Sequence, residues 1–390
     1  MGLCVAGVSA RWQCVDMGTS GRVLSVDGLD SLIRSISAEG YRVLGPSVVD
    51  DLIRITDISG VADLPAGVGD VQTAGKYAIR QRSDGALFGF ATPADTWKKY
   101  MFPPRVRLQS IAVPDGDEVV EHPPQDDRPV ALLGVRACDL AALRTHDRVL
   151  LDRVPDTDYA ARRTGALLIA VDCHTPADSC FCASMTTGPT VREENAADLI
   201  LTELLDEHRF LVRSGTEQGA ALLEGLATTE ATDEDTRAAA IQEQAATDAL
   251  TKSLDTTGLA DLLKQERNNP IWKQVAETCL SCGNCTMMCP TCFCVSVEDE
   301  ADALAGRDDR VRRWSSCFEL DYSYLHGGSI RESIPSRYRQ WLSHKFSTWW
   351  DQFDTSGCIG CGRCVTWCPV GIDVTESCKT IQEHQGQGLM

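Results

Sequence analysis

One cysteine pattern occurs twice in the last third of this 390-residue chain, and it constrains the fold more than any other feature. The first copy is Cys279, Cys282, Cys285 and Cys289, followed by Pro290, and the second copy is Cys358, Cys361, Cys364 and Cys368, followed by Pro369. Each copy is the C-x2-C-x2-C-x3-C-P run of bacterial two-cluster ferredoxins, in which the fourth cysteine of one run ligates the other cluster. The repeat therefore predicts two 4Fe-4S clusters.

Crossed ligation assigns four cysteines to each cluster. The first cluster is predicted to bind Cys279, Cys282, Cys285 and Cys368, and the second to bind Cys358, Cys361, Cys364 and Cys289. Gly283, Gly360 and Gly362 can take the positive φ that turns a loop toward a cluster. Zinc is the alternative, but zinc sites usually pair two C-x2-C knuckles around one ion rather than place four cysteines in such a short run.

Composition bounds the remaining possibilities. With 43% hydrophobic and 24% charged residues, a chain of this length is expected to form two or three globular domains. No apolar run approaches the eighteen residues needed to cross a bilayer, and residues 1–10 lack the basic flank of a secretory signal, so we expect a cytoplasmic protein without membrane insertion or disulfides. The net charge of −19 argues against a nucleic-acid partner.

The first half of the chain reads as an α/β domain. Residues 128–135 and 164–171 are predicted strands, and residues 139–151 form a predicted helix between them. Residues 77–90 are predicted to form a strand, a turn and a second strand. Cys138 and Cys173 then follow the two buried strands, as expected for a parallel sheet with a site along one edge.

Four thiols of this half form a possible third cluster site: Cys138, Cys173, Cys180 and Cys182. Their number fits a third 4Fe-4S cluster. No short motif specifies the set, so partly buried reduced cysteines or a zinc ion are alternatives. Three cysteines of the last third belong to none of these sets: Cys292, Cys294 and Cys317. They are residues near a cluster, core thiols or ligands of a further group. A short helix with Trp97, Lys98 and Lys99 is predicted to pack its tryptophan inward and expose its lysines, and a docking patch or an anionic site is the alternative.

These features divide the chain into three parts. Residues 1–190 are the α/β domain with the possible third cluster, and residues 191–268 are an acidic helical connector. Within the connector, 199–205 and 238–254 are predicted helices, and 228–235 is a predicted exposed loop. Residues 269–390 are a mainly helical, two-cluster ferredoxin-like domain, with a helical insertion between Cys289 and Cys358.

Several further motifs give the chain a family resemblance over residues 75–390. It resembles the beta (iron-sulfur) subunit of soluble NAD(P)-linked NiFe hydrogenases, the sulfhydrogenases, and the related electron-transfer subunit of anaerobic sulfite reductases. The motifs that carry the resemblance are Trp97-Lys98-Lys99, Gly134-Val135-Arg136-Ala137-Cys138-Asp139, Asp158-Tyr159-Ala160-Ala161-Arg162-Arg163, Cys173 with Cys180-Phe181-Cys182, Cys289-Pro290-Thr291-Cys292-Phe293-Cys294 and Trp314-Ser315-Ser316-Cys317.

The resemblance implies an electron-transfer subunit with no active site of its own. It would relay electrons between an FAD-containing NAD(P)H-oxidoreductase subunit and the small and large subunits of a NiFe hydrogenase. The sequence agrees, because it has no Gly-rich dinucleotide fingerprint, NiFe-type ligand pair or nucleophile constellation. The equivalent subunit of a sulfite reductase complex and a free-standing ferredoxin-like regulator are the alternatives.

Overall fold

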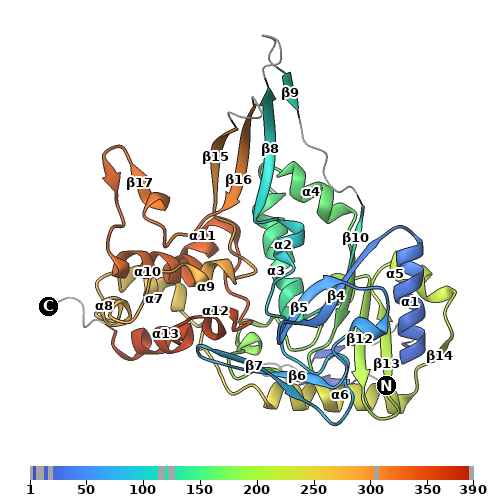
Figure 1. Ribbon diagram of the computed structural model, residues 1–390. Coiled ribbons are helices and arrows are strands. Elements are labelled where there is room, and N and C mark those ends of the chain that lie inside the picture. Colours follow the sequence, from blue (N-terminus) through green and yellow to red (C-terminus); the bar gives the residue numbers. More distant parts are fainter. Residues whose placement is uncertain are drawn as a thin grey trace.

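The computed structural model of the chain describes residues 3–5, 13–15, 21–112, 119–121, 128–302 and 307–385. Most of residues 1–10, where no secretory signal is predicted, lies outside these ranges. The described chain has two parts that lie side by side (Figure 1): a large sheet with its helices, and a group of C-terminal helices coloured gold to red. The N-terminal strands β1 (Leu3–Val5) and β2 (Gln13–Val15) form a separate antiparallel pair.

An eight-stranded mixed sheet is the framework of the first part, with the order β14-β3-β13-β12-β11-β10-β4-β5. Strands β4, β10, β11 and β12 are mutually parallel, and the outer strands pair antiparallel. The strands are β3 (Arg22–Ser25), β4 (Arg42–Val49), β5 (Leu52–Asp57), β10 (Val130–Val135), β11 (Leu167–Val171), β12 (Leu199–Leu204), β13 (Arg209–Ser214) and β14 (Thr228–Glu230). The predicted parallel pairing of the two buried strands is confirmed.

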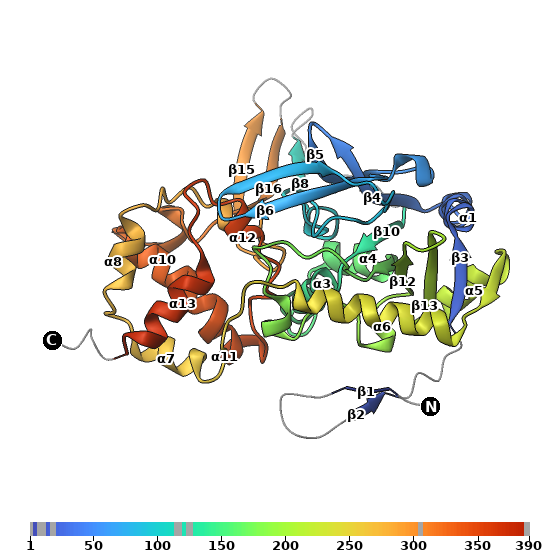
Figure 2. The same cartoon turned by 90° about the horizontal axis from the view of Figure 1, so that it is seen from below.

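Both faces of this sheet are covered, which explains the continuous apolar runs of its central strands. Leu133 and Ile169 face one core together with α1 (Val26–Ala38) and α5 (Glu217–Glu224). The opposite core is covered by α2 (Lys98–Met101), α3 (Ala137–Leu150) and α4 (Thr157–Thr164). Helix α6 (Asp233–Asp248) runs beneath β12 and β13 (Figure 2).

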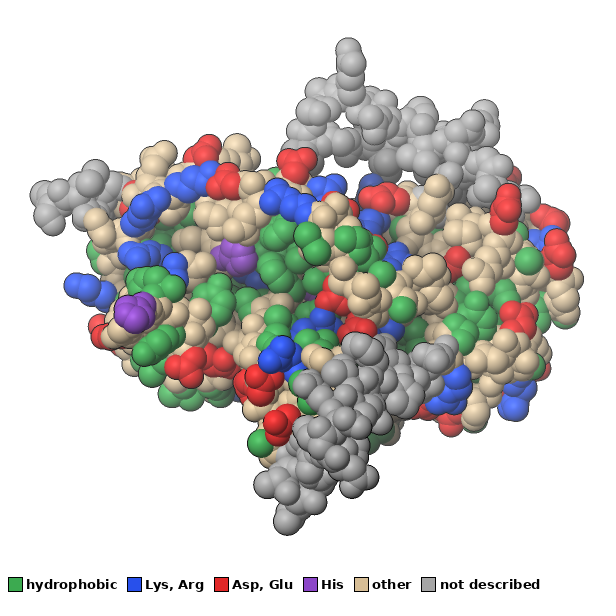
Figure 3. All heavy atoms as spheres, turned by 90° about the horizontal axis from the view of Figure 1, so that it is seen from above, with side chains coloured by type: hydrophobic (Ala, Val, Ile, Leu, Met, Phe, Trp, Pro, Cys, Tyr) green, Lys and Arg blue, Asp and Glu red, His purple; other side chains and the backbone are tan. Residues whose placement is uncertain are grey.

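A second sheet connects the two parts of the molecule. Its antiparallel order is β15-β16-β8-β9, so strands from the first part pair with strands from the last third of the chain. The members are β8 (Arg105–Ala112), β9 (Val119–Glu121), β15 (Val295–Asp302) and β16 (Arg307–Trp314). This sheet rises between the two halves in Figure 1. On the face shown in Figure 3, acidic and basic side chains are interspersed.

The C-terminal part consists of short helices around one hydrophobic core, accompanied by short strands. Its core includes Trp272, Tyr338, Trp341 and Leu342. The helices are α7 (Leu259–Gln265), α8 (Ile271–Ala276), α9 (Asn284–Met287), α10 (Ile334–Ser343), α11 (Trp349–Phe353), α12 (Arg363–Thr366) and α13 (Val374–Glu383), and the strands are β17 (Tyr324–Leu325) and β18 (Gly328–Ser329).

Several predicted elements are wrong. Residues 199–204 form strand β12, not a helix, because the segment is buried on both faces and extends the parallel sheet. The predicted loop at 228–235 contains strand β14 and the capped start of α6. The predicted hairpin at 77–90 is instead formed by β6 (Val68–Thr73) and β7 (Lys76–Gln81). The segment between Cys289 and Cys358 begins with two strands, not with helix. The domain boundaries at residues 190 and 268 stay a prediction.

Candidate iron–sulfur sites

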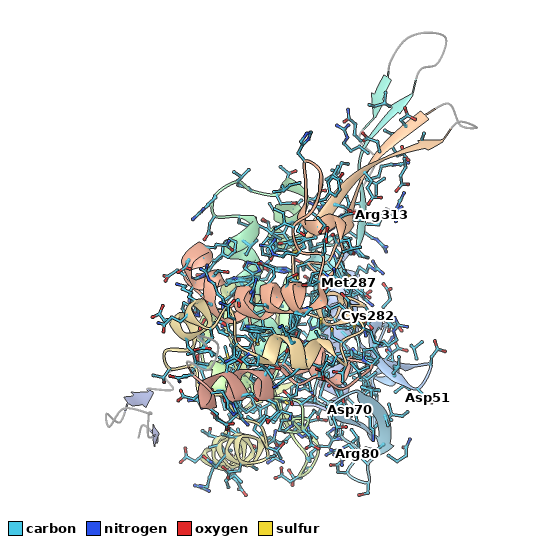
Figure 4. The ribbon with its side chains drawn as sticks, turned by 90° about the vertical axis from the view of Figure 1, so that its left-hand side faces the viewer. Asp51, Asp70, Arg80, Cys282, Met287 and Arg313 are labelled. Carbon is cyan, nitrogen blue, oxygen red and sulfur yellow. The ribbon has the colours of Figure 1, made fainter. Side chains whose placement is uncertain are left out.

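Site 1 is a cavity in the C-terminal part whose lining includes the four cysteines predicted for the first cluster: Cys279, Cys282, Cys285 and Cys368. Backbone N–H groups donate to two of the sulfurs, from Ser281 to Cys279 at 3.4 Å and from Ile372 to Cys368 at 3.3 Å. The Asn284 side chain donates to the Trp367 carbonyl at 2.5 Å and so ties the two motif loops together. Cys282 is exposed; it is labelled in Figure 4. The structure thus brings Cys368 to the first three cysteines of the other motif.

Site 2 lies deeper and gathers the other four motif cysteines: Cys358, Cys361, Cys364 and Cys289. Burial, and then the neighbouring thiols of Cys358, Cys289 and Cys361, raises the pKa of the Cys364 thiol well above its ordinary value. The Gly360 N–H donates to the Cys358 sulfur at 3.5 Å. Both sets of four that the crossed pattern predicts are therefore assembled in space, while cluster ligation by them stays a prediction.

The loop of site 2 packs directly on the loop that carries Cys180 and Cys182. Gly360 and Gly362 have φ values of 67° and 74°, and a Cβ atom there would lie 2.6 Å from the Phe181 carbonyl oxygen and 2.4 Å from the Ser179 carbonyl oxygen. Glycine is therefore required at both positions for conformation and for space. This close approach joins the C-terminal motif to the α/β part.

Site 3 is a small cavity at the carboxyl ends of β10 and β11. It is lined by the four remaining predicted thiols: Cys138, Cys173, Cys180 and Cys182. Cys361 of site 2 lines the same cavity. The Arg136 side chain, 1% exposed, donates to five backbone carbonyls, among them those of Phe88 and Phe90 at 2.7 Å. This arginine therefore fixes the loops that surround the four thiols.

A buried ion pair connects the α/β part to the second motif. Arg363, between two cysteines of site 2, donates to both carboxylate oxygens of Asp139 at 2.7 and 2.9 Å. The two side chains are 0% and 1% exposed, and Asp139 follows Cys138 of site 3. Such a bidentate pair fixes both distance and orientation. It therefore fixes the position of site 2 relative to site 3.

The buried cations show how the sites fit an anionic group. Among the described residues, six Lys and Arg side chains are buried: Lys98, Arg136, Arg312, Arg337, Lys345 and Arg363. Arg312 and Arg363 pair with carboxylates. The other four form no ion pair with a carboxylate of the described residues, and each lies beside a cysteine site.

A buried charge without a partner is costly, so these four cations require nearby negative charge. Arg337 donates to Ser281 in the loop of site 1, and Arg136 lines site 3. Lys98 and Lys345 lie near Cys289 and Cys292 at site 2. A 4Fe-4S cluster with four thiolates is anionic, and thiolates are its ordinary ligands. The residues present therefore fit such a group at all three sites.

Burial favours the neutral, protonated form of the thiols at site 3. It raises the pKa of the Cys182 thiol to about 12 and that of the Cys180 thiol well above its ordinary value. Because only the thiolate ligates metal, binding must release these protons. Within the described ranges, no three His, Cys, Asp or Glu side chains form a group that could hold a single metal ion.

The left-over cysteines line neither the cavity of site 1 nor that of site 3, and Cys317 lies near Cys285 of site 1. Cys292 lies beside Cys289, and Cys294 lies beside Cys317. The prediction for the lysine-bearing helix is wrong at Lys98, which is 3% exposed because its ammonium group donates to the Cys292 carbonyl at 3.2 Å. The buried cations were missed by the sequence reasoning, although Arg136 and Arg363 lie within two residues of predicted ligands.

The comparisons with known proteins agree with this geometry. Residues 278–372 match the family described as a 4Fe-4S dicluster domain, so the chain is an iron-sulfur protein of the electron-transfer class. The chain is 33% identical over 291 residues to "Sulfhydrogenase 2 subunit beta" of Pyrococcus furiosus, which covers 73% of this chain and 82% of the relative. The chain therefore belongs to the family of sulfhydrogenase beta subunits, as its motifs predict. No solved structure matches it. No helix in the described part is long and apolar enough to cross a membrane.

Proposed function

We propose that this chain is the non-catalytic electron relay of a cytoplasmic NAD(P)-linked hydrogenase complex. Iron-sulfur clusters, when bound, supply one-electron oxidation and reduction. The chain's own residues hold them, exclude water and fix their spacing. The observation that carries the proposal is the set of three neighbouring cysteine sites, each with a buried cation that lacks a carboxylate partner within the described ranges.

The contacts between the sites support a relay with a defined order. Cys364 of site 2 also lines the cavity of site 1, and Cys361 of site 2 lines the cavity of site 3. Site 2 therefore shares a wall with each of the others. We infer the order site 1, site 2, site 3, in which electrons enter or leave at the two ends.

A third 4Fe-4S cluster at site 3 is part of the proposal. Four thiols, three of them buried and Cys173 partly buried, support it together with Arg136, whose guanidinium donates to backbone carbonyls and forms no ion pair with a carboxylate of the described residues. Iron analysis of anaerobically purified chain should give about twelve iron atoms if all three sites are loaded and about eight if only the repeat is, at four per cluster. A value near eight that Cys138→Ala leaves unchanged would remove the third cluster.

The family membership supports a proposal for the partners. We propose an FAD-containing NAD(P)H-oxidoreductase subunit on one side and the small and large NiFe hydrogenase subunits on the other, since the relative is named as part of a sulfhydrogenase. The alternative is the electron-transfer subunit of an anaerobic sulfite reductase-type complex. Anaerobic purification of the native complex tests both: flavin with nickel supports the first partner set, and sirohaem supports the second. A chain that purifies alone would contradict both.

A further inference from the structure

The surroundings of Cys289 differ from those of the other motif cysteines. Lys345 lies in the π-helical turn His344–Thr348 between α10 and α11, and single π-helical turns are frequent at functional sites. Its ammonium group donates to Thr291 Oγ1 at 2.6 Å and to the Gly357 carbonyl at 3.0 Å. Thr291 Oγ1 lies 3.2 Å from the Cys289 sulfur. A buried positive charge is thus one hydroxyl away from a predicted ligand.

The hydrogen bonds of Thr291 show what this arrangement does. The hydroxyl has one proton, and without a bound group it donates that proton to the Gly357 carbonyl at 2.6 Å. A metal-bound Cys289 has no proton to donate, so it can only accept. Because Lys345 already donates to both Gly357 and Thr291, the hydroxyl proton is free to turn to the sulfur. The lysine therefore sets the direction of the hydroxyl.

A second lysine adds charge on the same side. Lys98 is held over the Trp314 ring at 3.7 Å and donates to the Cys292 carbonyl. Neither Lys98 nor Lys345 forms an ion pair with a carboxylate within the described ranges, and both are less than 5% exposed. Sites 1 and 3 have one such cation each, Arg337 and Arg136. Site 2 is the most positively surrounded of the three.

We propose that Lys345, acting through the Thr291 hydroxyl, is a positioning residue that raises the reduction potential of the cluster at site 2. The inference rests on the proposed function. Its physical basis is that net charge and hydrogen bonds to ligand sulfurs set cluster potentials. Each favours the reduced state, which has one more negative charge. In the order inferred above, the middle site then holds an electron between the two ends.

The test is a redox titration of the full-length chain, purified anaerobically and followed by EPR. The site 2 midpoint is the one that disappears in Cys289→Ser. Lys345→Met keeps the length of the side chain and removes its charge, and it should move that midpoint to a more negative potential. We expect at least a tenfold change in electron distribution, which is about 59 mV for a one-electron couple. Thr291→Val should shift the same midpoint in the same direction by less.

Two controls make the result specific. Lys264→Met removes a half-exposed lysine of α7, which pairs with Asp351, and should move no midpoint. Iron content distinguishes failure of the proposed function from failure of this inference. Wild-type chain without iron would overturn both. Full iron content with all midpoints unchanged in Lys345→Met and Thr291→Val would overturn the inference alone. If Lys345→Met loses iron from site 2, the Thr291→Val variant decides the inference: a more negative site 2 midpoint supports it, and an unchanged midpoint overturns it.

Discussion

Sites 1 and 2 share one cysteine pattern, yet the protein gives them different surroundings. Site 1 has an exposed predicted ligand, Cys282, and one buried cation, Arg337 of α10, that donates to its loop. Site 2 is enclosed by the α/β part, has two buried lysines, and is fixed to that part by the Arg363–Asp139 pair. A motif therefore determines which thiols meet, whereas the rest of the fold determines burial, charge and partners of each site.

The largest effect is expected from the crossed ligand. Cys368→Ser should remove about four iron atoms per chain, one cluster, and the lost cluster should be that of site 1, although Cys368 belongs to the motif of site 2. Iron analysis and EPR of the anaerobic protein measure this. Cys378→Ala is the control, because that cysteine is buried in the same part of the chain but lines neither cavity. Loss of the site 2 signal instead would contradict the crossed arrangement.

Breaking the buried ion pair should come next in size. Asp139→Asn leaves the Arg363 charge buried without its partner, which typically costs about 3–5 kcal/mol. The midpoint of denaturant unfolding measures the loss. Asp351→Asn, which breaks the exposed Lys264–Asp351 pair, should change stability little.

Loss of the Arg363–Asp139 pair should also affect sites 1 and 2 differently. Because Arg363 lies in the loop of site 2, Asp139→Asn should speed the release of iron to a chelator from site 2 and leave site 1 unchanged. Restoring an apolar fit with Asp139→Leu and Arg363→Met together should recover part of the stability. Equal effects of the Asp139 and Asp351 variants would show that the pair does not link the two parts.

A glycine in the site 2 loop tests the close approach to site 3. Gly362→Ala combines a positive φ, worth about 1–2 kcal/mol, with a Cβ atom 2.4 Å from the Ser179 carbonyl, worth about 1–3 kcal/mol more. Gly258→Ala is the matched control, since its φ is 67° and nothing lies within 4 Å of the added atom. Thermal unfolding should show the larger loss for Gly362. Equal losses would mean that the loops separate easily.

The sequence predicted much of this arrangement where the signal is local. The cysteine repeat identifies both sets of four thiols, and the predicted strands at 128–135 and 164–171 contain the parallel strands β10 and β11. Long-range partners were not predictable. Residues 199–204 have a helical apolar spacing, but burial against β11 makes them a strand. The sequence around Lys98 predicts a surface residue, because none of its sequence neighbours indicates that Cys292 lies beside it in the fold.

The smallest effect concerns site 1 alone and tests whether its loops are joined as loosely as its exposure suggests. Asn284→Ala removes the bond to the Trp367 carbonyl, the side-chain link between the two motif loops at this site, at a cost of about 1 kcal/mol. Release of iron to a chelator should become a few times faster at site 1 and stay constant at site 2. Asn269→Ala is a comparison at a distance from the loops, because its amide bonds to Glu266. A variant that released iron equally from both sites would show that the two motif loops open as one unit. Sites 1 and 2 would then differ in burial but not in how firmly their loops are held.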